Sequence, residues 1–151
     1  MSEENVSAAT PVAYDPLIDL MISNGIIDEQ QSSELREEHA LNGKPMRDLL
    51  VDMGYVAEDD LLAMMAAYQG CEVIDLEGFL PDTALLESVP GNVARMYTVM
   101  PVELSGGTIT LATSNLLEPQ VMDELMFVLT KDVHFVFARE KEVRALVAEH
   151  Y

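Results

Sequence analysis

Basic residues, cysteine and long apolar runs are scarce in this sequence, and each scarcity excludes a class of protein or partner. Eight residues are lysine or arginine against 27 aspartates and glutamates, so the formal net charge is −19. Nucleic acid is therefore not expected as a partner, because phosphate binding needs a positive surface. The single cysteine, Cys71, excludes an internal disulfide and is consistent with a reducing cytosol. No apolar run reaches the ~18 residues of a transmembrane helix, so direct membrane insertion is not expected.

Patterns that carry catalysis or metal binding are also missing. The phosphate-binding loop G-x-x-x-x-G-K-[ST] is absent, so the chain does not hydrolyse ATP by that route. The three histidines lack the spacing of metal ligands: His39, His134 and His150. Asp59 and Asp60 are adjacent on a predicted helix, where neighbouring side chains diverge and do not form a catalytic pair. We therefore expect no enzyme activity, no cofactor and no metal.

Hydrophobic residues make up 49% of the chain, which is enough to bury a core. Residues 1–13 are polar and show no periodicity, which predicts a disordered lead-in. They also lack the basic and apolar regions of a secretory signal. We divide the rest of the chain into a helical repeat subdomain over 14–72 and a small α/β subdomain over 73–151.

The helical subdomain contains one pattern twice. Residues 17–27 read LIDLMISNGII and residues 46–56 read MRDLLVDMGYV, at an offset of 29. Each copy predicts an amphipathic helix that ends at a glycine, Gly25 or Gly54, in the left-handed conformation. A second helix follows in each copy, and Asp28 with Gln31 predicts a capping box for the first of these. Two copies are too few for a solenoid, so we expect one four-helix unit.

The second subdomain alternates short strands with helices. The pattern predicts a strand-like link over 73–76, short helical segments within 83–96, strands at 98–104 and 108–113 around a hairpin turn, a helix at 117–129, a strand at 134–138 and a helix at 139–150. This order predicts an α+β fold: the four-helix unit is followed by a small α/β layer with a short, mostly antiparallel sheet.

Three stretches resemble a known family in their order and spacing. They read GKPMRDLLVDMGYVAEDDLLAMMAAYQG at 43–70, VPGNVARMYTVMPV at 89–102 and GGTITLATSN at 106–115. Together they resemble the N-terminal domain of type II secretion and type IV pilus assembly ATPases, which in some members binds cyclic di-GMP. The resemblance covers about residues 14–151. It implies a cytoplasmic domain that is recruited to the inner membrane through a partner.

The resemblance also implies where a nucleotide would bind. In the binding members each repeat begins with Arg-Leu-Gly and ends its second helix with Gln. The corresponding positions in this chain are Pro16, Ile18 and His39 in the first copy, and Pro45, Arg47 and Tyr68 in the second. All three key residue types are lost in both copies, so cyclic di-GMP is not expected to bind. Arg47, with Lys44, could still meet an anion, but we expect it to face solvent.

Two functions stay open at this stage. The first is a docking module for a basic surface of a membrane-associated secretion or pilus component. Its candidate surface is the helix predicted over 28–41, which has Ser32 and Arg36 where its sister helix has Leu61 and Met65. The candidate partner-binding residues are Glu34, Glu37 and Glu38; a merely solvated helix is the alternative. The second function is a receptor for cyclic di-GMP or another nucleotide through altered contacts.

Overall fold

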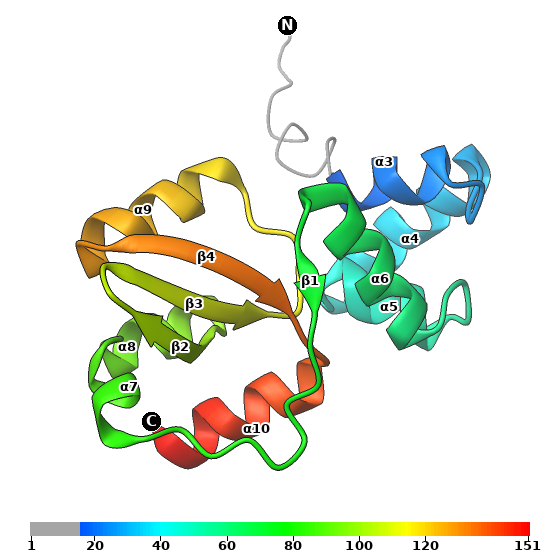
Figure 1. Ribbon diagram of the computed structural model, residues 1–151. Coiled ribbons are helices and arrows are strands. Elements are labelled where there is room, and N and C mark those ends of the chain that lie inside the picture. The colour runs from blue at the N-terminus through cyan, green and yellow to red at the C-terminus, as the bar shows by residue number, and fades with distance from the viewer. Residues whose placement is uncertain (1–15) are drawn as a thin grey trace, which may run out of the picture. The chain divides into compact units, whose positions relative to one another are not determined.

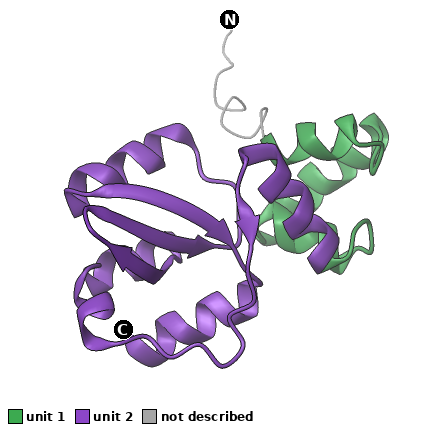
Figure 2. Ribbon diagram, viewed as in Figure 1, with its two compact units in different colours: residues 1–58 green, residues 59–151 purple. Residues whose placement is uncertain are grey.

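The computed structural model describes residues 16–151 (Figure 1). The lead-in predicted for residues 1–13 lies outside the described residues. The chain divides into two compact units, residues 1–58 and residues 59–151 (Figure 2). The subdomain boundary that we place at 72/73 from the sequence stays a prediction.

The described part of the first unit consists of helices. These are α3 (Pro16–Ser23), α4 (Glu29–Asn42) and α5 (Met46–Asp52). Each of the three contacts the other two. Ile18, Met21, Leu35 and Leu50 are fully buried, as the apolar spacing of the repeat requires. The fourth helix of the predicted repeat is also present as α6 (Glu58–Gln69).

The two copies of the repeat share the same turn. Gly25 has φ +73°, its N–H donates to the Ile22 carbonyl, and the Ile26 N–H donates to the Met21 carbonyl. This pair of bonds is a Schellman motif, which satisfies carbonyls at the end of a helix. Gly54, with φ +80°, repeats it through the bonds Gly54 N–H to Val51 O and Tyr55 N–H to Leu50 O. The positive φ predicted at both glycines is confirmed.

The second unit contains α6 and a four-stranded sheet. Its further elements are β1 (Glu72–Val73), α7 (Thr83–Glu87), α8 (Gly91–Tyr97), β2 (Met100–Ser105), β3 (Thr108–Thr113), α9 (Pro119–Leu129), β4 (Asp132–Phe137) and α10 (Glu140–His150). The strand order is β1-β4-β3-β2. Helix α9 lies along one face of the sheet, and α7, α8 and α10 lie on the other (Figure 1).

The strand directions correct one detail of the prediction. β2 and β3 form the expected antiparallel hairpin, but β3 pairs with β4 in parallel and β4 pairs with β1 in parallel. The sheet is therefore mixed, not mostly antiparallel. The reason is the connection through α9, because a crossover helix returns the chain to the starting end of the sheet. The α+β class itself is confirmed.

The core of the second unit lies on both faces of the sheet. Ile109 and Leu111 of β3 are fully buried, as are Leu125 of α9 and Val143 of α10. Tyr151 fixes the end of α10: its hydroxyl donates to the Leu86 carbonyl at 2.9 Å. Among the described residues, no helix is both long and apolar enough to cross a membrane.

Candidate functional site

The first copy of the ligand motif is filled by core packing. Ile18 is fully buried at the position where the binding members have a glycine. A branched side chain thus stands in place of the glycine that would let a ligand approach the backbone closely. Pro16 begins α3 and is half-buried. The half-buried His39 directs Nδ1 to the Lys44 carbonyl at 2.6 Å, so this ring nitrogen already has a partner within the chain.

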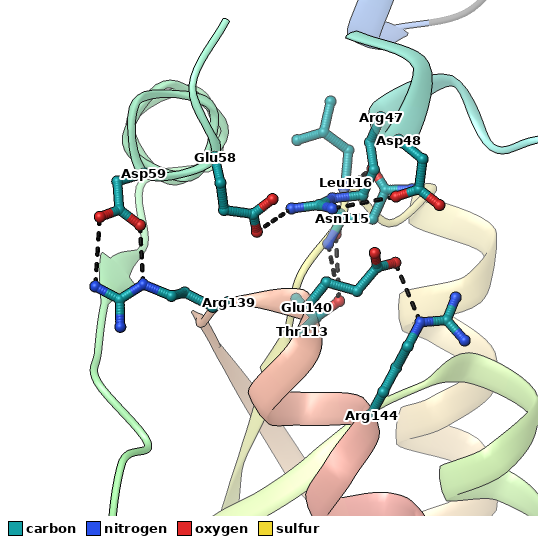
Figure 3. Close-up of polar contacts among 10 residues, drawn as sticks. All are labelled: Arg47, Asp48, Glu58, Asp59, Thr113, Asn115, Leu116, Arg139, Glu140 and Arg144. Carbon is teal, nitrogen blue, oxygen red and sulfur yellow. Dashed lines mark hydrogen bonds and ion pairs between the residues drawn. The ribbon is translucent and has the colours of Figure 1, made fainter. Parts of the chain in front are cut away.

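Arg47 in the second copy is buried, and the expectation that it faces solvent is wrong. Its side chain is 2% exposed. Nη2 donates to Glu58 Oε2 at 2.6 Å, and Nη1 donates to Asp48 Oδ1 at 3.4 Å (Figure 3). A buried guanidinium needs such carboxylates, because an uncompensated charge would lose its hydration. A phosphate at this position would therefore compete with carboxylates that the guanidinium already binds.

The other residues of the second copy also provide no positively charged side chain that is available to bind a phosphate. Pro45 is the exposed N-cap of α5 and makes no side-chain capping bond. Lys44 Nζ donates to Asp52 Oδ2 at 2.8 Å, and this bond raises the pKa of Lys44. Tyr68 is 57% exposed. Residues 16–58 carry nine carboxylates against three lysines and arginines, so their field opposes an anionic ligand.

The outer side of α4 carries the α4 acidic face, which we define as Glu34, Glu37 and Glu38. Their spacing of three and four residues places them on one side of the helix. Glu34 and Glu37 are exposed and Glu38 is half-buried. Glu38 Oε2 accepts from Asn42 Nδ2 at 3.0 Å, and the Tyr55 hydroxyl lies 3.5 Å from Glu34 Oε1. The carboxylates are thus loosely held and remain available at the surface.

The inner side of α4 holds few apolar anchors. Leu35 is fully buried, but the two other apolar residues of the helix, Ala40 and Leu41, are exposed. Ser32 is fully buried, and its hydroxyl has no hydrogen-bond partner among the described residues. The capping box of Asp28 with Gln31 is present, with bonds of 2.8 and 2.9 Å. Caps therefore supply much of the order of this helix.

A second arginine site, in the second unit, was not predicted from the sequence. Arg139 donates from Nε and Nη2 to the two carboxylate oxygens of Asp59, at 2.9 and 3.3 Å (Figure 3). Asp75 and Glu142 lie 3.7 and 3.5 Å from its Nη1. The hydrogen bond and charge of Arg139 lower the pKa of Asp59. Eighty residues separate the bonded pair, so no local pattern could have indicated it.

The Asp59–Arg139 pair lines a shallow pocket of about 290 Å³. Leu62, Val73 and Ile74 complete its lining with Asp75. The lining residues include no serine, cysteine or histidine, and the described residues contain no cluster that could hold a metal ion. Cys71 is half-buried, and burial raises the pKa of its thiol.

The fold, with its helical repeat and mixed sheet, defines the class of N-terminal domains found in secretion and pilus ATPases. Residues 69–151, more than half of the chain, match the MshEN domain family. The chain belongs to this family, as the sequence resemblance predicts.

Two curated relatives are type IV pilus assembly ATPases. PilB of Myxococcus xanthus (strain DK1622) is 26% identical over 133 residues, which cover 88% of this chain and 24% of the relative. PilB of Acinetobacter baylyi (strain ATCC 33305 / BD413 / ADP1) is 20% identical over 142 residues, which cover 94% of this chain and 24% of the relative. The chain thus spans about a quarter of the length of the curated relatives it matches.

Two solved structures share the fold. A structure of MshE with cdg (cyclic di-GMP) has a TM-score of 0.73 and 26% sequence identity, and the match covers 91% of this chain and all of that chain. The N-terminal domain of XpsE has a TM-score of 0.67 and 16% identity, with 99% of each chain covered. The MshE structure contains the nucleotide, so it matters for function whether this chain keeps the residues of the ligand motif.

Proposed function

We propose that this chain is a non-catalytic docking module of a secretion or pilus assembly system. It binds a basic surface of a membrane-associated component, lies in the cytoplasm and reaches the inner membrane through that partner. Membership of the MshEN family supports the class of system. The buried Ile18 and the carboxylate-bound Arg47 support a role other than nucleotide binding.

The α4 acidic face is the observation that carries the proposal. Glu34 and Glu37 are exposed, and the helix beneath them is held by caps and a single fully buried leucine. An acidic helix surface of this kind is complementary to lysine and arginine side chains, and such complementarity mainly raises the association rate. Binding should therefore weaken as the salt concentration rises.

The test is charge reversal across this face. A variant with Glu34→Lys, Glu37→Lys and Glu38→Lys should capture much less of the native partner from membrane extracts, with a nearly unchanged melting temperature. The matched control reverses three exposed carboxylates of the second unit, through Glu77→Lys, Glu87→Lys and Glu103→Lys. Both variants change the net charge by the same amount, so they differ only in which surface carries the reversed charges. Undiminished capture by the first variant, or equal loss in both, would remove the α4 acidic face from the interface.

A nucleotide receptor is the second candidate function. The structure of MshE with cdg favours it, because that protein shares 26% of its sequence and the fold with this chain. It would have to use altered contacts, since the arginine, glycine and glutamine of the motif are missing from their positions in both copies. A calorimetric titration separates the two functions.

A further inference from the structure

Helix α9 has an outer side that core packing does not use. Leu125 and Leu129 face the core and are buried. Phe127 lies two residues after Leu125, which is about 200° around the helix, and it is 84% exposed. Met126 and Val128 are partly exposed on either side of it. These three consecutive residues form the α9 apolar patch.

The α9 apolar patch differs from the other exposed apolar side chains of the described residues. Leu80 is as exposed as Phe127, at 84%, but its chain neighbours Phe79 and Pro81 are partly buried, and Phe79 packs against the core. Isolated exposed leucines are ordinary on protein surfaces, whereas contiguous apolar patches mark interaction sites. An aromatic side chain that offers ~150–250 Å² for burial is the typical centre of such a site.

The charges around the patch are mainly negative. Asp123 lies one helical turn before Phe127 and is exposed. Glu124 Oε2 accepts from the Tyr97 hydroxyl at 2.8 Å, and Asp132 is exposed just after the helix. Lys131 is half-buried and is the one basic residue within residues 118–132. The rim of the patch is therefore acidic.

We propose that the α9 apolar patch docks into a partner protein that presents an apolar pocket rimmed by lysine and arginine. Phe127 would enter the pocket, and Asp123 would meet the basic rim. A second copy of this chain is a poor occupant, because it would bring two acidic rims and two net charges of −19 together. An anionic lipid surface is repelled in the same way. The patch lies outside the unit that carries the α4 acidic face, so this proposal stands independently of that face.

Photocrosslinking at the centre of the patch tests the proposal. The full chain carries p-benzoylphenylalanine in place of Phe127, in the cells that naturally make it, and a control chain carries it in place of Leu80. We expect an adduct with another protein from position 127 alone, and the crosslinked peptide should contain or adjoin several lysines or arginines. Adding Asp123→Lys should lower the adduct yield several-fold.

Each other result would overturn the proposal: an adduct with only a second copy or lipid, equal adducts from both positions, a peptide without basic residues, an insensitive yield or no adduct. The variants Phe127→Ser and Leu80→Ser check the folded state. Both variants should have the melting temperature of the wild type, because each removed side chain is 84% exposed. A lower melting temperature for Phe127→Ser alone would place Phe127 in the core and contradict the patch.

Discussion

The hydroxyl of Ser32 is a buried donor without a partner among the described residues. The corresponding residue in the second copy of the repeat is Leu61, which is also fully buried but carries no polar group that needs a hydrogen bond. A buried hydroxyl that loses its hydration without gaining a hydrogen bond destabilises the folded state. Position 32 is therefore a place where a single substitution should improve stability.

Ser32→Ala should raise the free energy of unfolding by about 1 kcal/mol or more, since it removes the unsatisfied hydroxyl and improves helix propensity. The exposed neighbour supplies the control, because Ser33→Ala changes propensity alone and should give about 0.5 kcal/mol or less. Denaturant unfolding of both variants measures the difference. Equal effects would mean that the Ser32 hydroxyl is satisfied.

Glycine turns are the elements on which the repeat depends. Gly54→Ala should lower the free energy of unfolding by more than ~1 kcal/mol, because alanine resists the left-handed φ of +80°. No atom lies within 4 Å of the added Cβ, so the loss would be backbone strain and not a clash. Gly107→Ala also meets open space, but at a backbone conformation that alanine accepts, so it should be tolerated. Thermal melts that shift equally for the two variants would contradict the turn geometry.

The ion pair between α6 and the start of α10 predicts a dependence on pH. Arg139 lowers the pKa of Asp59, so the stabilisation is fully present above the ordinary aspartate pKa of about 4 and is lost as pH falls through the lowered value. The melting temperatures of the wild type and Asp59→Asn should therefore differ by a small, constant amount above about pH 5 and converge in acid. Asp60→Asn, one residue away and also exposed, is the control. A gap that widens on acidification would contradict the assignment.

Caps and periodicity located the elements well, and they failed where the information is not local. The capping box placed α4 at 28–41, and the helix runs from Glu29 to Asn42. The strand patterns located β3 and β4, but alternation of side chains does not encode strand direction. The parallel pairing of β3 with β4 follows from the crossover connection through α9.

At the scale of the whole molecule, the order of three motifs was enough to indicate the family, because these motifs consist largely of the core and turn residues that the fold requires. The state of the candidate nucleotide site was harder to predict. The residue types at the motif positions could be read from the sequence, but the burial of Arg47 could not, since its partner Glu58 lies eleven residues away in a different helix. The α4 acidic face could be predicted from composition and spacing alone, and its role in docking stays a proposal.

The central claim is that this chain keeps the scaffold of a nucleotide-binding domain while its own function is to bind a protein. Calorimetric titration with cyclic di-GMP tests it most directly, with the MshE domain as the positive control in the same buffer. The account predicts a dissociation constant larger than ~100 μM, so the binding free energy should be no more favourable than about −5.5 kcal/mol. The reasons are the buried Ile18 and an Arg47 whose guanidinium already binds Glu58 and Asp48. A dissociation constant in the low micromolar range would contradict the account and make the chain a nucleotide receptor.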